Sequence, residues 1–518
     1  MHSQPVNRTE RFLSGLGLGY LFQGLSMIVG VALTPFMLRH LGQHDYGLWL
    51  ASFQILNYLM LIDFGVVMLL PREIAYATGR ASGVQQASDL PQSLGQAARL
   101  KLYQTPLVAL AAGLCWLFMP PAWREFQGPI GVLLLAFAVT FPFRLCRGAL
   151  EGLQDLGFVG RVHILTWLVG LIVNVALVLA GWGLYALAAG WIVTQVAAGG
   201  LYAFRLWSHF PSVLPRRLPR LATGALKQYL TRGFWVTVNQ TAGSLLWGSD
   251  LLLIGNLLGP SAVIPYTCTG KLASALSNQP QLLMEAAIPG LSEIRTGATR
   301  DRQLHVSQAL SQGMLLLSGA VACVVLAVNE GFVSWWVGSQ FYGGLVLTTA
   351  FVLNMVLRHL NLTLAYANFC FGHERRIAVT ALVDGLITVG SAYFLIGRLG
   401  LIGALTGSIL GVCLVGLPVN ARTTCREGGL GFWALLSPLG PWLVRFVLLA
   451  AGMLTVATQW TPRGPALLAA AGLACGLLYV GVMVRPMLQS ALGPYLKSSV
   501  ARFLRRRGGK AEEFEVGA

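Results

Sequence analysis

Residues 35–75 read PFMLRHLGQHDYGLWLASFQILNYLMLIDFGVVMLLPREIA. The stretch contains the end of one apolar segment, a short polar hinge, and a second apolar segment that stops at Pro71-Arg72-Glu73. Both segments reach the roughly 20 apolar residues that an α-helix needs to cross a bilayer. Asp63 lies inside the second segment, where a charge is costly and usually functional. The stretch therefore predicts two membrane-spanning helices and one candidate site residue.

The composition extends this interpretation to the whole chain. Of 518 residues, 55% are hydrophobic and only 11% are charged, and the mean hydropathy is +0.66. Soluble proteins carry about 25% charged residues. The eight cysteines contain no CxxC spacing, which excludes a zinc site or a disulfide framework of the usual kind. The sequence therefore predicts an all-α polytopic membrane protein with no cofactor.

Fourteen segments are long and apolar enough to be membrane spans. They are 14–38, 46–70, 102–119, 129–146, 163–181, 184–204, 234–258, 262–290, 307–329, 343–370, 379–397, 400–420, 441–459 and 466–484. Of the 36 Lys and Arg residues, 29 fall on the side of the membrane that holds both termini, and four fall on the other side. The positive-inside rule then predicts that both termini are cytoplasmic. It also explains the net charge of +17 without nucleic acid as a partner.

An internal repeat divides the chain. Shifted by 217 positions, Gln23 matches Gln240, the pair Leu41-Gly42 matches Leu258-Gly259, and Gly183 and Gly190 match Gly400 and Gly407. The shift covers six spans, which predicts two parallel six-helix lobes with a substrate cavity between them. The expected domains are an N-terminal lobe (1–204), a basic linker (205–233), a C-terminal lobe (234–420), two extra helices (421–484) and a cytoplasmic tail (485–518).

Two stretches carry a resemblance to a known family. Residues 41–75, LGQHDYGLWLASFQILNYLMLIDFGVVMLLPREIA, and residues 249–273, SDLLLIGNLLGPSAVIPYTCTGKLA, resemble the polysaccharide transporter family. This is the Wzx-type flippase branch of the superfamily that also contains multidrug and toxin extruders and peptidoglycan-lipid flippases. The resemblance extends over residues 10–420. Pro265 stands before Tyr266 where the family usually has glycine.

The resemblance implies a flippase that moves an undecaprenyl-pyrophosphate-linked oligosaccharide across the bacterial inner membrane. Alternating access would be driven by a coupling cation, either H⁺ or Na⁺. The implied partners are the lipid-linked oligosaccharide and membrane lipids, with polysaccharide polymerase and chain-length proteins as further candidates.

Charges within the predicted spans supply the candidate site. Lys271 and Arg358 are the candidates for binding the anionic head group, because a guanidinium offers a bidentate fork to phosphate. Asp63 and Asp250 are the candidates for the coupling ion. The alternatives are that Asp250 and Lys271 form a permanent ion pair, and that a neighbouring carboxylate neutralises Arg358 between packed helices.

Two features bear on the other function classes: the motifs that the sequence lacks and the mixed signs of the charges within its predicted spans. The chain has no GxxxxGK[ST], HExxH or GxSxG motif and no long outward loop, so we expect no enzyme activity. A cation-coupled multidrug exporter of the same superfamily would have an acidic, aromatic pocket, whereas the charges within these spans are mixed. A non-transporting scaffold would have all of these charges sealed in ion pairs.

Overall fold

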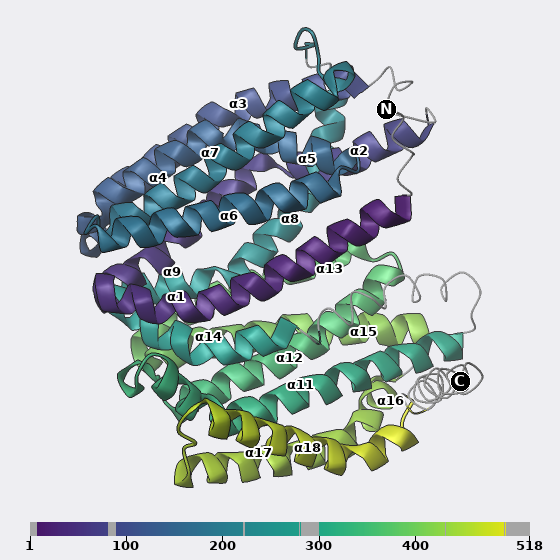
Figure 1. Cartoon of the computed structure of the whole chain (residues 1–518). Helices are drawn as coiled ribbons and strands as arrows, with labels where there is room; N and C mark the ends of the chain where they lie inside the picture. Colours follow the sequence, from purple (N-terminus) through teal and green to yellow (C-terminus); the bar gives the residue numbers. More distant parts are fainter. Residues whose placement is uncertain are drawn as a thin grey trace, which may run out of the picture. The chain divides into compact units, whose positions relative to one another are not determined.

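The computed structural model describes residues 8–80, 90–220, 223–278, 280, 300–429, 431–491 and 493. Within these ranges the chain consists of helices and connecting turns without any β-strand (Figure 1). Eleven helical segments of the described residues are long and apolar enough to cross a membrane. In a bilayer only a helix or a closed barrel satisfies every backbone hydrogen bond. The predicted all-α polytopic membrane fold is confirmed.

The difference between eleven segments and fourteen predicted spans has a local cause. The first segment, Leu18–Asp63, contains two predicted spans joined at Gly42, whose φ of 82° interrupts the helix. The predicted span 234–258 is divided at Gly248 into two helices. The predicted span 262–290 is helical from 263 to 278, and most of its remainder lies outside the described residues.

The chain forms two compact units, Met1–Ile264 and Pro265–Ala518, and each is described by itself. In the first unit, Figure 1 shows α3, α4, α6 and α7 running alongside one another. The elements of this unit are α1 (Arg8–Leu59), η1 (Met60–Asp63), α2 (Val66–Arg80), α3 (Leu90–Leu117), η3 (Pro121–Phe126), α4 (Gln127–Thr140), η4 (Phe141–Phe143), α5 (Arg144–Gly152), α6 (Leu156–Leu179), α7 (Leu184–His209), η5 (Pro211–Val213), α8 (Thr223–Trp247), α9 (Ser249–Leu257) and η6 (Pro260–Ala262).

The first unit includes α8 and α9, which the sequence analysis grouped with the C-terminal lobe. Both helices contact α1, and the Gln43 side chain donates a hydrogen bond to the Ser261 carbonyl at 2.8 Å. The predicted lobe boundaries at 204 and 233 stay a prediction. The predicted tail, 485–518, is described only up to residue 493.

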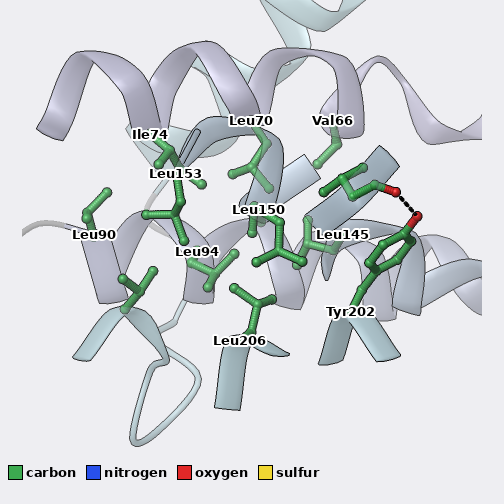
Figure 2. Packing of buried hydrophobic residues seen from close by; sticks show 14 of the residues in the cluster. Val66, Leu70, Ile74, Leu90, Leu94, Leu145, Leu150, Leu153, Tyr202 and Leu206 are labelled. Atoms are coloured by element: carbon green, nitrogen blue, oxygen red, sulfur yellow. Dashed lines mark hydrogen bonds between the residues drawn. The ribbon is translucent and has the colours of Figure 1, made fainter. Parts of the chain in front are cut away.

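A hydrophobic core holds α2, α3, α5 and α7 together (Figure 2). Leu70 and Ile74 of α2 pack against Leu145 and Leu150 of α5, and all four are buried. Tyr202 of α7 joins the same core, and its hydroxyl donates a hydrogen bond to the Val159 carbonyl at 3.3 Å (Figure 2). Because burying such a side chain stabilises by roughly 1.5–3 kcal/mol, this core fixes the ends of the helices that carry Asp63 and Arg144.

The second unit contains the remaining helices. They are the helical residues 265–278, α11 (Arg300–Trp336), η7 (Ser339–Phe341), α12 (Leu345–Cys370), α13 (Glu374–Leu399), α14 (Leu401–Gly411), η8 (Val412–Gly416), α15 (Leu417–Gly428), α16 (Phe432–Leu436), η9 (Ser437–Leu439), α17 (Gly440–Gln459) and α18 (Pro465–Gln489). The two extra helices of the sequence analysis, α17 and α18, pack on α11. Tyr479 of α18 is buried there and accepts a hydrogen bond from Trp442 at 2.9 Å.

The internal repeat is visible in the backbone. Gly183 and Gly400 each precede a helix, with φ/ψ of 54°/−134° and 60°/−139°. Gly42 and Gly259 also agree, with φ of 82° and 91°. These four positive φ values suit glycine and strain other residues. Matching conformations at matched positions support the 217-residue repeat.

We predict that Gly183→Ala and Gly400→Ala each lower stability by about 1–3 kcal/mol, the usual strain of a non-glycine residue at such dihedrals. A Cβ at either position would meet no atom within 4 Å, so the cost comes from the backbone alone. Thermal unfolding of the purified protein measures it. Gly200→Ala is the control, since Gly200 lies within α7 in open space. Unfolding temperatures equal to that of wild type would contradict the prediction.

Candidate functional site

A cavity of about 810 Å³ lies within the first unit. Its walls come from α1, η1, α2, α4, η4, α5, α6, α7 and α8, and they are rich in amides, hydroxyls and arginines. The polar and charged lining residues are Gln54, Asn57, Asp63, Thr140, Arg144, Arg147, Glu151, His163, Thr166, Thr194, Gln195, Tyr202, Gln240 and Ser244. Its volume falls within the range of about 300–1,000 Å³ typical of ligand pockets.

A break in the second span places Asp63 on the cavity wall. After the 3₁₀ turn Met60–Asp63, Phe64 and Gly65 have positive φ values of 48° and 69°. The helix resumes at Val66. Gly233 of α8 lies directly against the Phe64 carbonyl, where any Cβ would clash. The break is therefore held by backbone packing as well as by its own turn.

Asp63 is buried, and both of its carboxylate oxygens are occupied. Lys101 of α3 forms an ion pair with Oδ1, and the Val67 amide donates to Oδ2 at 3.0 Å. Gln104, one turn further along α3, donates to the Asp63 backbone carbonyl at 3.1 Å. The Lys101 ammonium also lies 3.8 Å from the centre of the Phe141 ring. Such contacts are what a buried charge needs, since unpaired it would cost several kcal/mol.

Arg144, Arg147 and Glu151 lie on one face of α5, because their spacing is i, i+3 and i+7. Arg147 donates from Nε to Glu151 at 2.8 Å within that helix. Arg144 is partly buried and lies within electrostatic range of Arg147 and Lys101. Among the residues that the structure describes, the Arg144 side chain takes part in neither an ion pair nor a hydrogen bond. A cavity wall with such a cation is suited to binding an anion.

The structure separates the four predicted site residues. Asp63 lines the cavity of the first unit. Asp250 lies in the first turn of α9 in the same unit, half-buried and within electrostatic range of Tyr58. Lys271 is half-buried on the helix 263–278, in the second unit. The predicted pairing of Asp250 with Lys271 therefore joins two different units and stays a prediction.

Arg358 is in the second unit, in the middle of α12, and its side chain is only 7% exposed. Its guanidinium donates to the Asp384 carboxylate at 2.7 Å, to Thr388 at 3.1 Å and to the Ser408 carbonyl at 2.9 Å. This is the arrangement considered as the alternative, in which a carboxylate neutralises Arg358 between packed helices. As a ligand for the substrate, Arg358 would have to leave these partners.

A π-helical turn, Val412–Gly416, lies beside this ion pair. A Cβ on Gly411 or on Gly416 would collide with the Asp384 carboxylate, and Gly416 also lies against the Asn361 amide. Further along, Asn420 donates to Asn361 at 2.8 Å. The π turn and its flanking glycines therefore let the backbone approach a buried polar cluster closely.

The sequence analysis missed three charged residues of this site. Lys101, Arg144 and Arg147 were counted among the loop charges that set orientation. For Arg144, Arg147 and Glu151, the helical spacing on one face was an available signal. For Lys101 there was none, because its partner lies 38 residues away in the sequence.

The fold is that of a class of membrane transporters. The structure resembles an inward-facing multidrug resistance transporter of the MATE family in the MOP superfamily, with a TM-score of 0.52, 14% identity, and coverage of 83% of this chain and 96% of that one. It also resembles the lipid II flippase MurJ in an inward closed conformation, with a TM-score of 0.54, 9% identity, and coverage of 86% and 98%. At these identities the likeness shows the fold. A search of curated proteins returned no match.

The family follows from the sequence itself. The model of the family described as polysaccharide biosynthesis protein matches residues 12–295, more than half of the chain. The chain belongs to this family, as the resemblance of residues 41–75 and 249–273 predicted. It is thus a protein of the polysaccharide biosynthesis family with many candidate membrane-spanning helices and a MATE-like fold.

We predict that Arg358→Met destabilises the protein by about 3–5 kcal/mol, because it leaves Asp384 as an unpaired buried charge. The double variant Arg358→Met with Asp384→Leu should recover most of that loss. Thermal unfolding distinguishes the two. A fully stable single variant would show that the pair is not structural and would favour a direct role for Arg358 in substrate binding.

Proposed function

We propose that this protein flips an undecaprenyl-pyrophosphate-linked oligosaccharide from the cytoplasmic to the outer leaflet of the bacterial inner membrane. Family membership supports a role in polysaccharide biosynthesis. The observation that carries the proposal is Arg144, a cation without a carboxylate partner among the described residues, on the wall of a cavity of about 810 Å³ lined by amides and hydroxyls.

The charge pattern of the cavity favours an anionic head group. Arg147 is paired with Glu151, and Asp63 is paired with Lys101, so Arg144 is left as the uncompensated charge. A guanidinium binds phosphate through two parallel N–H groups, and such charge-assisted hydrogen bonds are about twice as strong as neutral ones. A lipid pyrophosphate would supply the missing anion.

The uncharged part of the lining suits a saccharide. Gln54, Asn57, Gln195 and Gln240 carry amides with both donors and an acceptor, although Asn57 already donates to Gln54 at 2.8 Å. Sugar hydroxyls also donate and accept, so one amide can bond to two of them. Trp247 at the edge of the same cavity adds an apolar aromatic surface. Together these residues can hold sugars next to a phosphate-binding arginine.

A cation-coupled multidrug exporter is the alternative. Its cationic substrates would need a free carboxylate in the cavity. Of the two lining carboxylates, Asp63 is engaged by Lys101, and Glu151 is engaged by Arg147. A cationic drug would instead meet Arg144, which repels it.

Asp63 and Asp250 remain our proposed residues for the coupling cation, H⁺ or Na⁺. In this structure Lys101 already acts as the counter-charge of Asp63, so a coupling cation there would have to displace it. Lys271 and Arg358, in the second unit, remain proposed ligands of the head group. Arg358 would bind it in a conformation in which its ion pair with Asp384 is broken.

The remaining proposals concern topology and partners. We propose that both termini are cytoplasmic, as the Lys and Arg distribution predicts. Removing Lys101, Arg144 and Arg147 from the count of loop charges leaves that bias large. Polysaccharide polymerase and chain-length proteins are the proposed protein partners.

The function is tested by the sidedness of the lipid-linked glycan. Cells lacking the gene should accumulate the glycan on the cytoplasmic leaflet, as detected with an impermeant glycan probe in vesicles of known orientation. Arg144→Gln should reduce complementation at least about tenfold, since one hydrogen bond to a charged group contributes about 1.5–3 kcal/mol. Arg161→Gln is the matched control, because Arg161 is an exposed arginine of α6 outside the cavity lining.

Two results would oppose the proposal. Unchanged glycan sidedness in the deletion strain would refute the substrate, and drug accumulation would be the next measurement. Full complementation by Arg144→Gln would refute the proposed head-group position while leaving the substrate open.

A further inference from the structure

The cavity of the first unit contains an electrostatic conflict that one buried residue resolves. Asp63 and Arg144 both line it, and opposite charges on one wall attract strongly where the dielectric constant is low. If they paired with each other, the cavity would have no cation left for an anionic ligand. In the structure they are not paired, because Lys101 occupies Asp63.

Lys101 does not belong to the cavity surface. Its side chain is 1% exposed, and it is absent from the lining residues. It approaches Asp63 from behind, from α3, and its ammonium lies against the Phe141 ring. A ligand in the cavity would touch Asp63 and Arg144 but not Lys101.

The carboxylate is also held in one orientation. Lys101 takes Oδ1, the Val67 amide takes Oδ2, and Gln104 holds the Asp63 carbonyl. Two of these three contacts come from the same turn of α3. Removal of Lys101 would free Oδ1 and leave Asp63 with an uncompensated charge. Arg144, within electrostatic range of the Lys101 ammonium, is the cation of the lining that would replace it.

We propose that Lys101 is a positioning and specificity-determining residue: by neutralising Asp63 from outside the cavity, it leaves Arg144 available to bind the diphosphate of an isoprenyl-linked substrate. The residue acts through Arg144 and makes no contact with the ligand. This inference rests on the proposed function, since it concerns the anion that Arg144 binds.

Anion binding should therefore depend on which charged residues are paired and not on the total charge of the cavity. Lys101→Gln should abolish anion binding as effectively as loss of Arg144, because Asp63 then captures Arg144. The double variant Asp63→Asn with Lys101→Gln should restore anion binding, because no carboxylate at position 63 is left to capture Arg144. Removing both members of a buried ion pair is also often neutral for the fold.

The test uses the purified full-length protein in detergent, without an ion gradient, so that coupling does not enter. The probe is farnesyl pyrophosphate, followed by titration calorimetry, with farnesol as the control for the isoprenyl chain and inorganic pyrophosphate as competitor. We expect both Arg144→Gln and Lys101→Gln to raise the Kd at least about tenfold, the loss of one charge-assisted contact. The Kd of the double variant should return to within about threefold of the wild-type Kd. Arg161→Gln should have the wild-type Kd.

The outcomes separate the inference from the proposed function. If wild type and Arg161→Gln bind farnesyl pyrophosphate no better than farnesol, the proposed substrate class fails. If wild type binds and Arg144→Gln does not, but Lys101→Gln binds normally, the role of Lys101 is refuted. A double variant that folds but fails to bind would refute it as well. Should Lys101→Gln not fold, the double variant still decides, because it has no unpaired buried charge and must bind.

Discussion

The structure depends on the compensation of charge inside an apolar protein. An ionised side chain among membrane-spanning helices needs a partner, because its desolvation otherwise costs several kcal/mol. Asp63 with Lys101 and Arg358 with Asp384 meet this requirement, one pair in each unit. Each pair joins two different helices, η1 with α3 and α12 with α13, through residues 38 and 26 positions apart in the sequence. The packing of these helices and the pairing of their buried charges therefore depend on each other.

Much of the fold followed from sequence, whereas the partners of the buried charges did not. Hydropathy located the spans because the bilayer imposes length and apolarity on each helix. It also identified Asp63, since a lone carboxylate is conspicuous in an apolar run. Hydropathy could not distinguish Lys101 from a loop charge, because that residue ends a polar segment and its neutralisation depends on tertiary packing. For Arg358 a neighbouring carboxylate was anticipated as a partner, but only the tertiary structure identifies it as Asp384.

The two units share matching helices and differ in the side chains that these helices carry. At the 217-residue offset, α6 and α7 match α13 and α14, and the starting residues Leu184 and Leu401 coincide. The charged residues do not follow the repeat: Arg144 corresponds to Asn361, and Lys101 corresponds to Ser318. Asn361 accepts a hydrogen bond from Asn420, and Ser318 bonds with His359 at 2.6 Å. At these matched positions the duplicated framework thus has cationic side chains in its first copy and neutral polar side chains in its second.

The π turn at Val412–Gly416 distinguishes the second copy of the repeat from the first. A π turn contains one more residue than an α turn, so it shifts every later side chain by about 100° around the helix axis. The matching stretch of the first copy, 195–199, lies within the uninterrupted helix α7, where Gln195 and Gly199 line the cavity. In the second copy the corresponding Val412 and Gly416 are buried, and Gly416 lies against Asp384. The π turn thus coincides with the stretch where the two copies differ: the residues line a cavity in the first copy and are packed interior in the second.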